Sequence, residues 1–77
     1  MPRYVTFISW VGKRWSESEK VEFTARNARK ARRRHRQKLK EFEEQQGNYD
    51  PPNSVRDGGL YRIGKHGICV QKLAVKG

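Results

Sequence analysis

The large apolar residues of this 77-residue chain stand at its two ends, and this distribution constrains the fold more than any other feature. Leu, Ile, Val and Phe number 15 in all, under about 20% of the chain, and with a net charge of +10 so low a share is typical of disordered proteins. Six of the 15 nevertheless lie in residues 1–23 and six in residues 60–77, so the middle holds only Leu39, Phe42 and Val55. We expect the two ends to pair into one core, with the polar middle lying across it.

The two terminal regions have the composition of β-hairpins. Residues 3–11 are rich in β-branched and aromatic side chains, and residues 19–24 alternate charged with apolar side chains, so both segments are expected to be strands. Residues 60–73 have similar features, with Gly64 and Gly67 at the tip of a second hairpin. Each hairpin is expected to contribute one apolar face to the shared core.

Between the hairpins, residues 25–46 change to a helical period. Five residues at spacings of three and four share one face of such a helix: Ala28, Ala31, His35, Leu39 and Phe42. Thr24 or Asn27 is a suitable N-cap, and Gly47 suits the position that follows the last turn. At 1.5 Å per residue this helix would be about 33 Å long, so we expect one end to protrude beyond a small sheet.

The segment 47–59 is expected to be a loop. Pro51 and Pro52 exclude a helix, and Asp57-Gly58-Gly59 has the composition of a turn. The chain 1–77 is therefore predicted to form a single small α+β domain with the order β-β-α-β-β. In this fold, an antiparallel sheet of three to four strands has one long basic helix packed across it.

The predicted helix carries half of the positive charge of the chain. Nine of the 18 Lys and Arg residues lie between Arg26 and Lys40, and no acidic residue interrupts the sequence from Phe23 to Lys40. Five of the nine form a stripe turned away from the apolar face: Arg26, Arg29, Arg33, Arg36 and Lys40. Like charges at this spacing destabilise a helix, and cations in its first turns oppose the helix dipole. Consistent departure from these local rules indicates a function.

Phosphate is the anion that this choice of residues favours, because six of the nine cations are Arg, whose planar guanidinium forms paired hydrogen bonds with phosphate oxygens. We predict a non-enzymatic nucleic-acid-binding protein, with DNA and RNA both open, in which the helix contacts phosphates and the second hairpin assists. The predicted binding residues are Arg26, Arg29, Lys30, Arg32, Arg33, Arg36, Lys40, Arg62 and Lys65. The stretch 25–39 is similar in composition to the arginine-rich RNA-binding peptides of phage antiterminators, through arginine density alone.

Two other functions remain open from the sequence. A small phage-type protein of this composition can instead bind a host nucleoprotein complex through protein–protein contacts and modulate or inhibit it. A small endoribonuclease would place His66, beside Lys65, near a scissile phosphate and would need a second acid or base close by.

The remaining aromatic, histidine and cysteine residues have simpler interpretations. His35 is interpreted as a core histidine, and Cys69, which alternates with apolar neighbours, as a buried inert thiol. Trp10 and Trp15 are interpreted as core and cover, with a platform for stacked bases as the alternative.

The sequence offers no site for a cofactor or a metal. The single cysteine and the two histidines lack a zinc-ligand spacing, and no catalytic triad or phosphate-binding loop is recognisable. The lone cysteine and the lack of a signal-peptide cleavage site favour a reducing, cytoplasmic setting, and no apolar run is long enough to span a membrane. An edge strand, either 3–11 or 68–75, would allow a homodimer to form.

Overall fold

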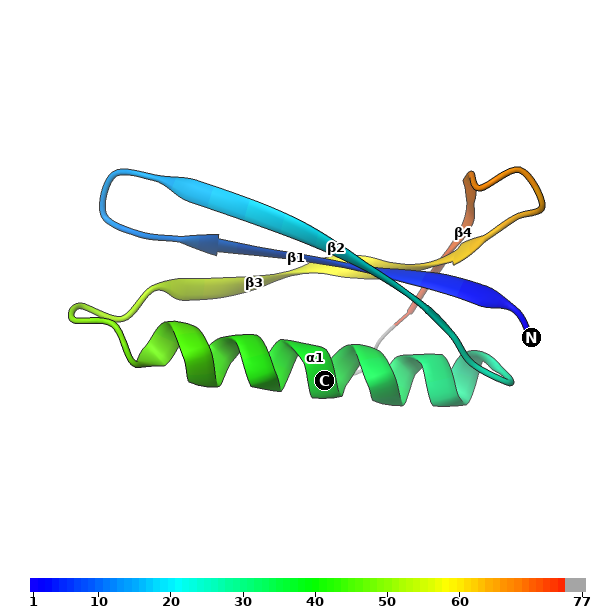
Figure 1. Cartoon of the computed structure of the whole chain (residues 1–77), viewed down its shortest axis with the longest axis horizontal. Coiled ribbons are helices and arrows are strands. Elements are labelled where there is room, and N and C mark those ends of the chain that lie inside the picture. The colour runs from blue at the N-terminus through cyan, green and yellow to red at the C-terminus, as the bar shows by residue number, and fades with distance from the viewer. Residues whose placement is uncertain (75–77) are drawn as a thin grey trace.

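The computed structural model describes residues 1–74, without the side chains of residues 69 and 70. Its elements are β1 (Arg3–Val11), β2 (Ser16–Thr24), α1 (Ala28–Gly47), β3 (Ser54–Ile63) and β4 (Cys69–Leu73). The strands form one antiparallel sheet in the order β2-β1-β3-β4, and α1 lies across one of its faces (Figure 1). The predicted α+β class and the β-β-α-β-β order are confirmed.

The interior strand β1 joins the two ends of the chain. It pairs with β2 on one side and with β3 on the other, so both terminal regions meet in one sheet. Alternate residues of a strand point to opposite faces, and on the α1 side Tyr4 packs with Ala31, Leu60 and Leu73. Ala31 and Leu60 are fully buried. The apolar ends therefore form one core, as predicted.

The edges of the sheet are β2 and β4. Residues 3–11 form β1, which is hydrogen-bonded on both sides, so the expectation that this segment offers a free edge for a homodimer is wrong. The other expected edge, 68–75, includes the edge strand β4, but residue 75 lies outside the described residues. The side chain of Cys69 also lies outside them, so its burial stays a prediction.

The structure corrects the predicted loop 47–59, because β3 begins at Ser54 and only the residues between α1 and Ser54 connect the two elements. Asp57-Gly58-Gly59 forms a β-bulge opposite Phe7 and Ile8 rather than a turn. A Cβ on Gly58 would lie 2.7 Å from the Phe7 carbonyl oxygen, and Gly59 has φ of +105°. Glycine is suited to the close backbone approach and the positive φ of a bulge and of a turn alike. The pairing of these residues with β1 makes the segment a bulge.

The structure also shifts two predicted boundaries. β2 begins at Ser16 instead of residue 19, because its exposed polar residues pair with the end of β1 as far as Val11. α1 begins at Ala28 instead of residue 25, because the Asn27 side chain caps it by accepting the Lys30 N–H at 3.0 Å. At the other end, Gly47 is still helical and Asn48 is the C-cap, so the predicted role of Gly47 is wrong.

The expectation that one end of the helix protrudes beyond the sheet is wrong. β1 and β2 have nine residues each and β3 has ten, so at about 3.3 Å per residue they match the about 30 Å of the helix. Figure 1 shows the two layers running side by side over this length. The predicted hairpin 60–73 corresponds to the end of β3 and to β4, and Gly67 in its turn has φ of +74°.

Candidate nucleic-acid interface

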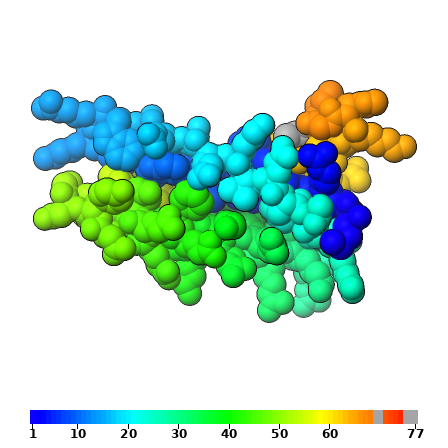
Figure 2. Space-filling model, in the orientation of Figure 1, coloured from blue at the N-terminus to red at the C-terminus, as the bar shows by residue number. Residues whose placement is uncertain are grey.

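The helix α1 presents one buried and one cationic side. Ala31 and His35 are fully buried against the sheet, whereas Arg29, Arg33 and Lys40 are exposed. Figure 2 shows side chains from the N-terminal half of α1 projecting from the side of the molecule away from the sheet. The separation of the two faces follows from the helical period of the sequence, because residues three and four apart lie on the same side.

Four of the predicted binding residues surround a single surface depression of about 430 Å³. Its lining consists of Asn27, Arg29, Lys30, Arg33 and Arg36, and contains no carboxylate. The first turn of α1 has no acidic residue either, so the positive end of the helix dipole adds to the potential of the side chains. The depression is therefore a concave, cationic surface of the kind that attracts phosphate.

A second depression of about 290 Å³ lies beside the first and shares Lys30 and Arg33 with it. Arg26 also lines this second depression. It does so from the segment before α1, because the helix begins only after its N-cap, Asn27. Arg34 also lines it, and its guanidinium carbon lies 5.6 Å from the centre of the Phe23 ring, a cation–π distance. The predicted site omitted Arg34, although its helical position between the stripe and the apolar face is a signal for such a flanking role.

Arg32 lies on the other flank of α1. Its Nε donates a hydrogen bond of 2.8 Å to the carbonyl oxygen of Ala74, just after β4. Arg32 is only half-exposed and does not line the first depression. Arg32, one of the predicted binding residues, thus attaches the helix to the end of the last strand and lies away from the stripe.

The two residues predicted to assist from the second hairpin do not join this cluster. Arg62 is exposed on β3, opposite Tyr4 in β1, and Lys65 is exposed in the turn that follows β3. Figure 1 shows that this turn projects away from α1. Lys40 remains exposed on α1 but lines neither depression. Of the predicted set, the structure therefore brings together Arg29, Lys30, Arg33 and Arg36 around the first depression.

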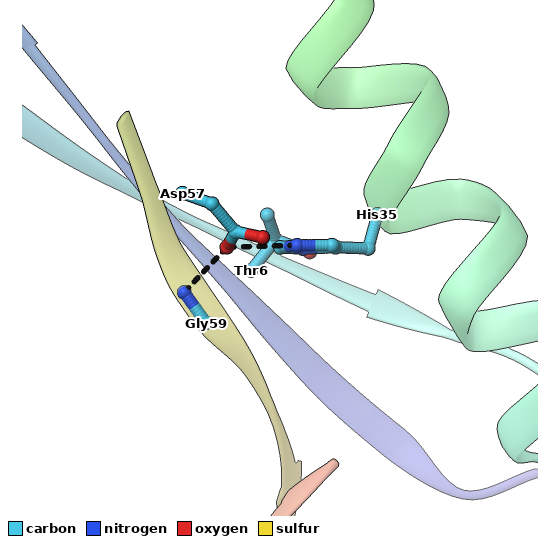
Figure 3. Close-up of polar contacts among 4 residues, drawn as sticks. All are labelled: Thr6, His35, Asp57 and Gly59. Carbon is cyan, nitrogen blue, oxygen red and sulfur yellow. Dashed lines mark hydrogen bonds and ion pairs between the residues drawn. The ribbon is translucent and has the colours of Figure 1, made fainter. Parts of the chain in front are cut away.

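His35 occupies a buried polar link between α1 and the sheet (Figure 3). Its Nδ1 lies 3.2 Å from the Thr6 hydroxyl, within hydrogen-bond distance. Its Nε2 lies 2.9 Å from Oδ1 of Asp57, but the two groups meet at too oblique an angle for a well-aligned hydrogen bond. The order of hydroxyl, imidazole and carboxylate is that of a hydrolytic triad. Thr6 and His35 both have 0% exposure, so a substrate has no access to the hydroxyl and the link is structural. The interpretation of His35 as a core histidine is confirmed.

The other candidate side chains have ordinary surroundings. Trp10 stacks on Phe42 with ring centres 5.4 Å apart, and the half-exposed Trp15 covers Gly12 at the turn between β1 and β2. His66 is exposed in the turn before β4 and forms no hydrogen bond or ion pair with another described residue. Among the residues whose side chains the structure describes, no group of three potential metal ligands is present, and no helix of the described chain has the length and apolarity to cross a membrane.

Comparison with known proteins adds no further constraint on this site. No protein-family model, curated protein or solved structure matches the chain. The function therefore has to be inferred from the chemistry of the surface itself.

Proposed function

We propose that this protein binds nucleic acid without catalysing a reaction, and that the N-terminal half of α1 contacts phosphates. The observation that carries the proposal is the carboxylate-free depression lined by Arg29, Lys30, Arg33 and Arg36. Cations gathered around one hollow repel one another in the free protein, and a polyanion that enters it relieves this repulsion. Binding also releases the counterions that surround the nucleic acid.

The shape of the helix suits an extended anion better than a small one. The exposed stripe from Arg29 to Lys40 runs about 17 Å along the helix axis, which is longer than any single phosphate group. A polynucleotide backbone presents phosphates over such a length, and the major groove of duplex DNA is about 12 Å wide and admits an α-helix. The opposite face of α1 is fixed on the sheet through Ala31 and His35, so the stripe is held outward.

The main rival is an acidic protein surface, which would meet the same cations. Arginine favours phosphate because its planar fork binds two oxygens of one group, but carboxylates accept the same bonds. The experiment that follows therefore includes an arm for a protein partner.

The proposal is tested by reversing charge on the stripe and, separately, at a distant place. Arg29→Glu with Arg33→Glu alters the depression, and Lys13→Glu with Arg14→Glu makes the same change in net charge in the exposed turn between β1 and β2 (Figure 1). Binding of labelled duplex DNA, duplex RNA and single strands is measured by fluorescence anisotropy, with circular dichroism as the check on folding. We expect the stripe variant to lose about tenfold or more in affinity, and the control to lose about threefold or less.

The result that would contradict the proposal is a folded stripe variant with wild-type affinity for every nucleic acid. Capture of partners before and after nuclease treatment then separates the two classes of ligand. Partners that persist after nuclease treatment, and that the stripe variant fails to capture, would favour a protein-binding role for the same surface.

A further inference from the structure

The face of the sheet turned away from α1 carries a second group of aromatic and basic residues. Thr6 of β1 reaches His35 on the helix side, so its neighbours Val5 and Phe7 lie on the other side. The strand register places Tyr61 beside Val5 and Lys20 beside Phe7. We call this side of the sheet the open face and define it by five residues that the register places there: Phe7, Lys20, Arg56, Tyr61 and Lys72.

Two aromatic rings lie at the centre of the open face. The rings of Phe7 and Tyr61 meet edge to face, with centres 5.4 Å apart, and both side chains are only partly buried. Gly59 lies beside them, opposite Phe7, and a Cβ there would come within 3.1 Å of the Tyr61 ring and 3.4 Å of Lys72 Cε. The glycine therefore allows the Tyr61 and Lys72 side chains to lie directly over the backbone of β3, next to Phe7.

Exposed cations surround the aromatic pair. Lys20 on β2, Arg56 on β3 and Lys72 on β4 are exposed, and none of them forms an ion pair with another described residue. The carboxylate of Glu22, which shares this face through its register with Val5, is bound to Arg3 at 3.1 Å. The open face thus has a net positive charge at its periphery and π surfaces in its centre.

We infer that the open face binds single-stranded nucleic acid, with bases stacking on Phe7 and Tyr61 and phosphates meeting Lys20, Arg56 and Lys72. Proteins that bind single strands combine aromatic platforms with cations that follow the backbone. From β2 to β4 the face spans three strand spacings, about 14 Å, which leaves room for the rings between the cations. An apolar protein surface laid over the same rings would desolvate the three cations without pairing them.

This inference concerns a surface different from the stripe on α1, on the other side of the sheet. It does not depend on the proposed function, and the two fail independently. Duplex binding that is lost only on changing α1, together with single-strand binding that is lost only on changing the open face, would show two separate sites. One molecule would then be able to hold a duplex and a single strand on opposite sides.

The test uses the full chain and single-stranded probes of about 12 nucleotides, oligothymidine and oligouridine, with a duplex of equal length for comparison. Lys20→Glu with Lys72→Glu removes the flanking cations, and Lys13→Glu with Arg14→Glu is the matched charge control at an exposed turn. Phe7→Leu keeps an apolar side chain beside Tyr61 but removes the π surface. We expect the charge variant to lose about tenfold or more of the single-strand affinity, and Phe7→Leu to lose about fivefold or more.

A second measurement needs no variant. Oligonucleotides that carry 4-thiothymidine are crosslinked to the wild-type protein by near-ultraviolet light, and the modified peptides are identified by mass spectrometry. Crosslinks to the peptides of β1 or β3 that contain Phe7 or Tyr61 support the inference. Crosslinks confined to α1, or wild-type single-strand affinity in either variant, would overturn it.

Discussion

The Nε2 atom of His35 lies 2.9 Å from Oδ1 of Asp57, and this contact links α1 to the bulge of β3. Asp57 Oδ1 also accepts the backbone N–H of Gly59 at 2.8 Å, and the other imidazole nitrogen lies 3.2 Å from the hydroxyl of Thr6 in β1. One buried side chain thus connects the helix to both interior strands. Because His35 lies on the buried side of α1, these contacts help to determine that the arginine stripe faces outward.

Removal of the buried imidazole is expected to be strongly destabilising. His35→Ala leaves a cavity between α1 and the sheet and deprives Thr6 and Asp57 of their partner, a combination that costs about 2–4 kcal/mol. In a domain of this size that corresponds to a fall in Tm of about 10 °C or more by thermal denaturation. The exposed Gln37→Ala in the same helix serves as control and should melt close to wild type. Equal melting of both variants would show that the link is dispensable.

The apolar side of α1 should contribute more to stability than its charge. Phe42 stacks on Trp10 and is partly buried, so Phe42→Ala is expected to cost about 2–3 kcal/mol, below the cost for a fully buried ring. Leu39 is also only partly buried and has a smaller side chain, so Leu39→Ala should lower the free energy of unfolding by less than Phe42→Ala does. Arg33→Ala should leave the free energy of unfolding unchanged or raise it slightly, since it relieves repulsion. Urea denaturation measures all three, and unfolding of Arg33→Ala under conditions where Phe42→Ala stays folded would reverse this assignment of the faces.

Two glycines should respond in opposite directions to the same substitution. Gly58→Ala would bring a Cβ within 2.7 Å of the Phe7 carbonyl, so the bulge must shift and the domain is destabilised. Gly47→Ala meets no atom within 4 Å and lies in α1 without a positive φ, so it should stabilise by about 0.5 kcal/mol. Thermal melts of the pair make the comparison. Destabilisation by Gly47→Ala, or none by Gly58→Ala, would contradict the described backbone.

If the stripe lies against phosphates, the salt dependence of the affinity for duplex DNA should reflect the number of phosphate contacts. Four cations surround the first depression and Arg26 lies beside the second, so we expect a slope of log affinity against log salt of about −4. Single Arg29→Ala or Arg33→Ala variants should each reduce the slope by about one. Anisotropy titrations at several salt concentrations provide the measurement. Identical slopes for these variants and for Lys13→Ala would indicate that net charge alone governs binding.

The sequence by itself determined the elements that depend on local periodicity. Residues 3–11 are rich in β-branched and aromatic side chains, and Ala31 and His35 stand four apart on the helix, so the strand and the buried helix face were predictable. The position of the arginine stripe followed from the same period. Asn27 was one of two expected caps, and its side chain accepts the Lys30 N–H. Each of these features depends on residues within a few positions of one another.

Only the tertiary structure decided features that depend on contacts between distant segments. Asp57-Gly58-Gly59 has the same local chemistry whether it forms a turn or a bulge, and its pairing with Phe7 in β1 makes it a bulge. The helical period alone does not distinguish Arg32, which bonds to the carbonyl of Ala74, from an arginine available for binding. The open face arises because the register of β1 and β3 brings Phe7 and Tyr61 together. Pairing between strands far apart in the chain sets this register, and a slip of one residue along either strand would turn its aromatic side chain to the other face of the sheet.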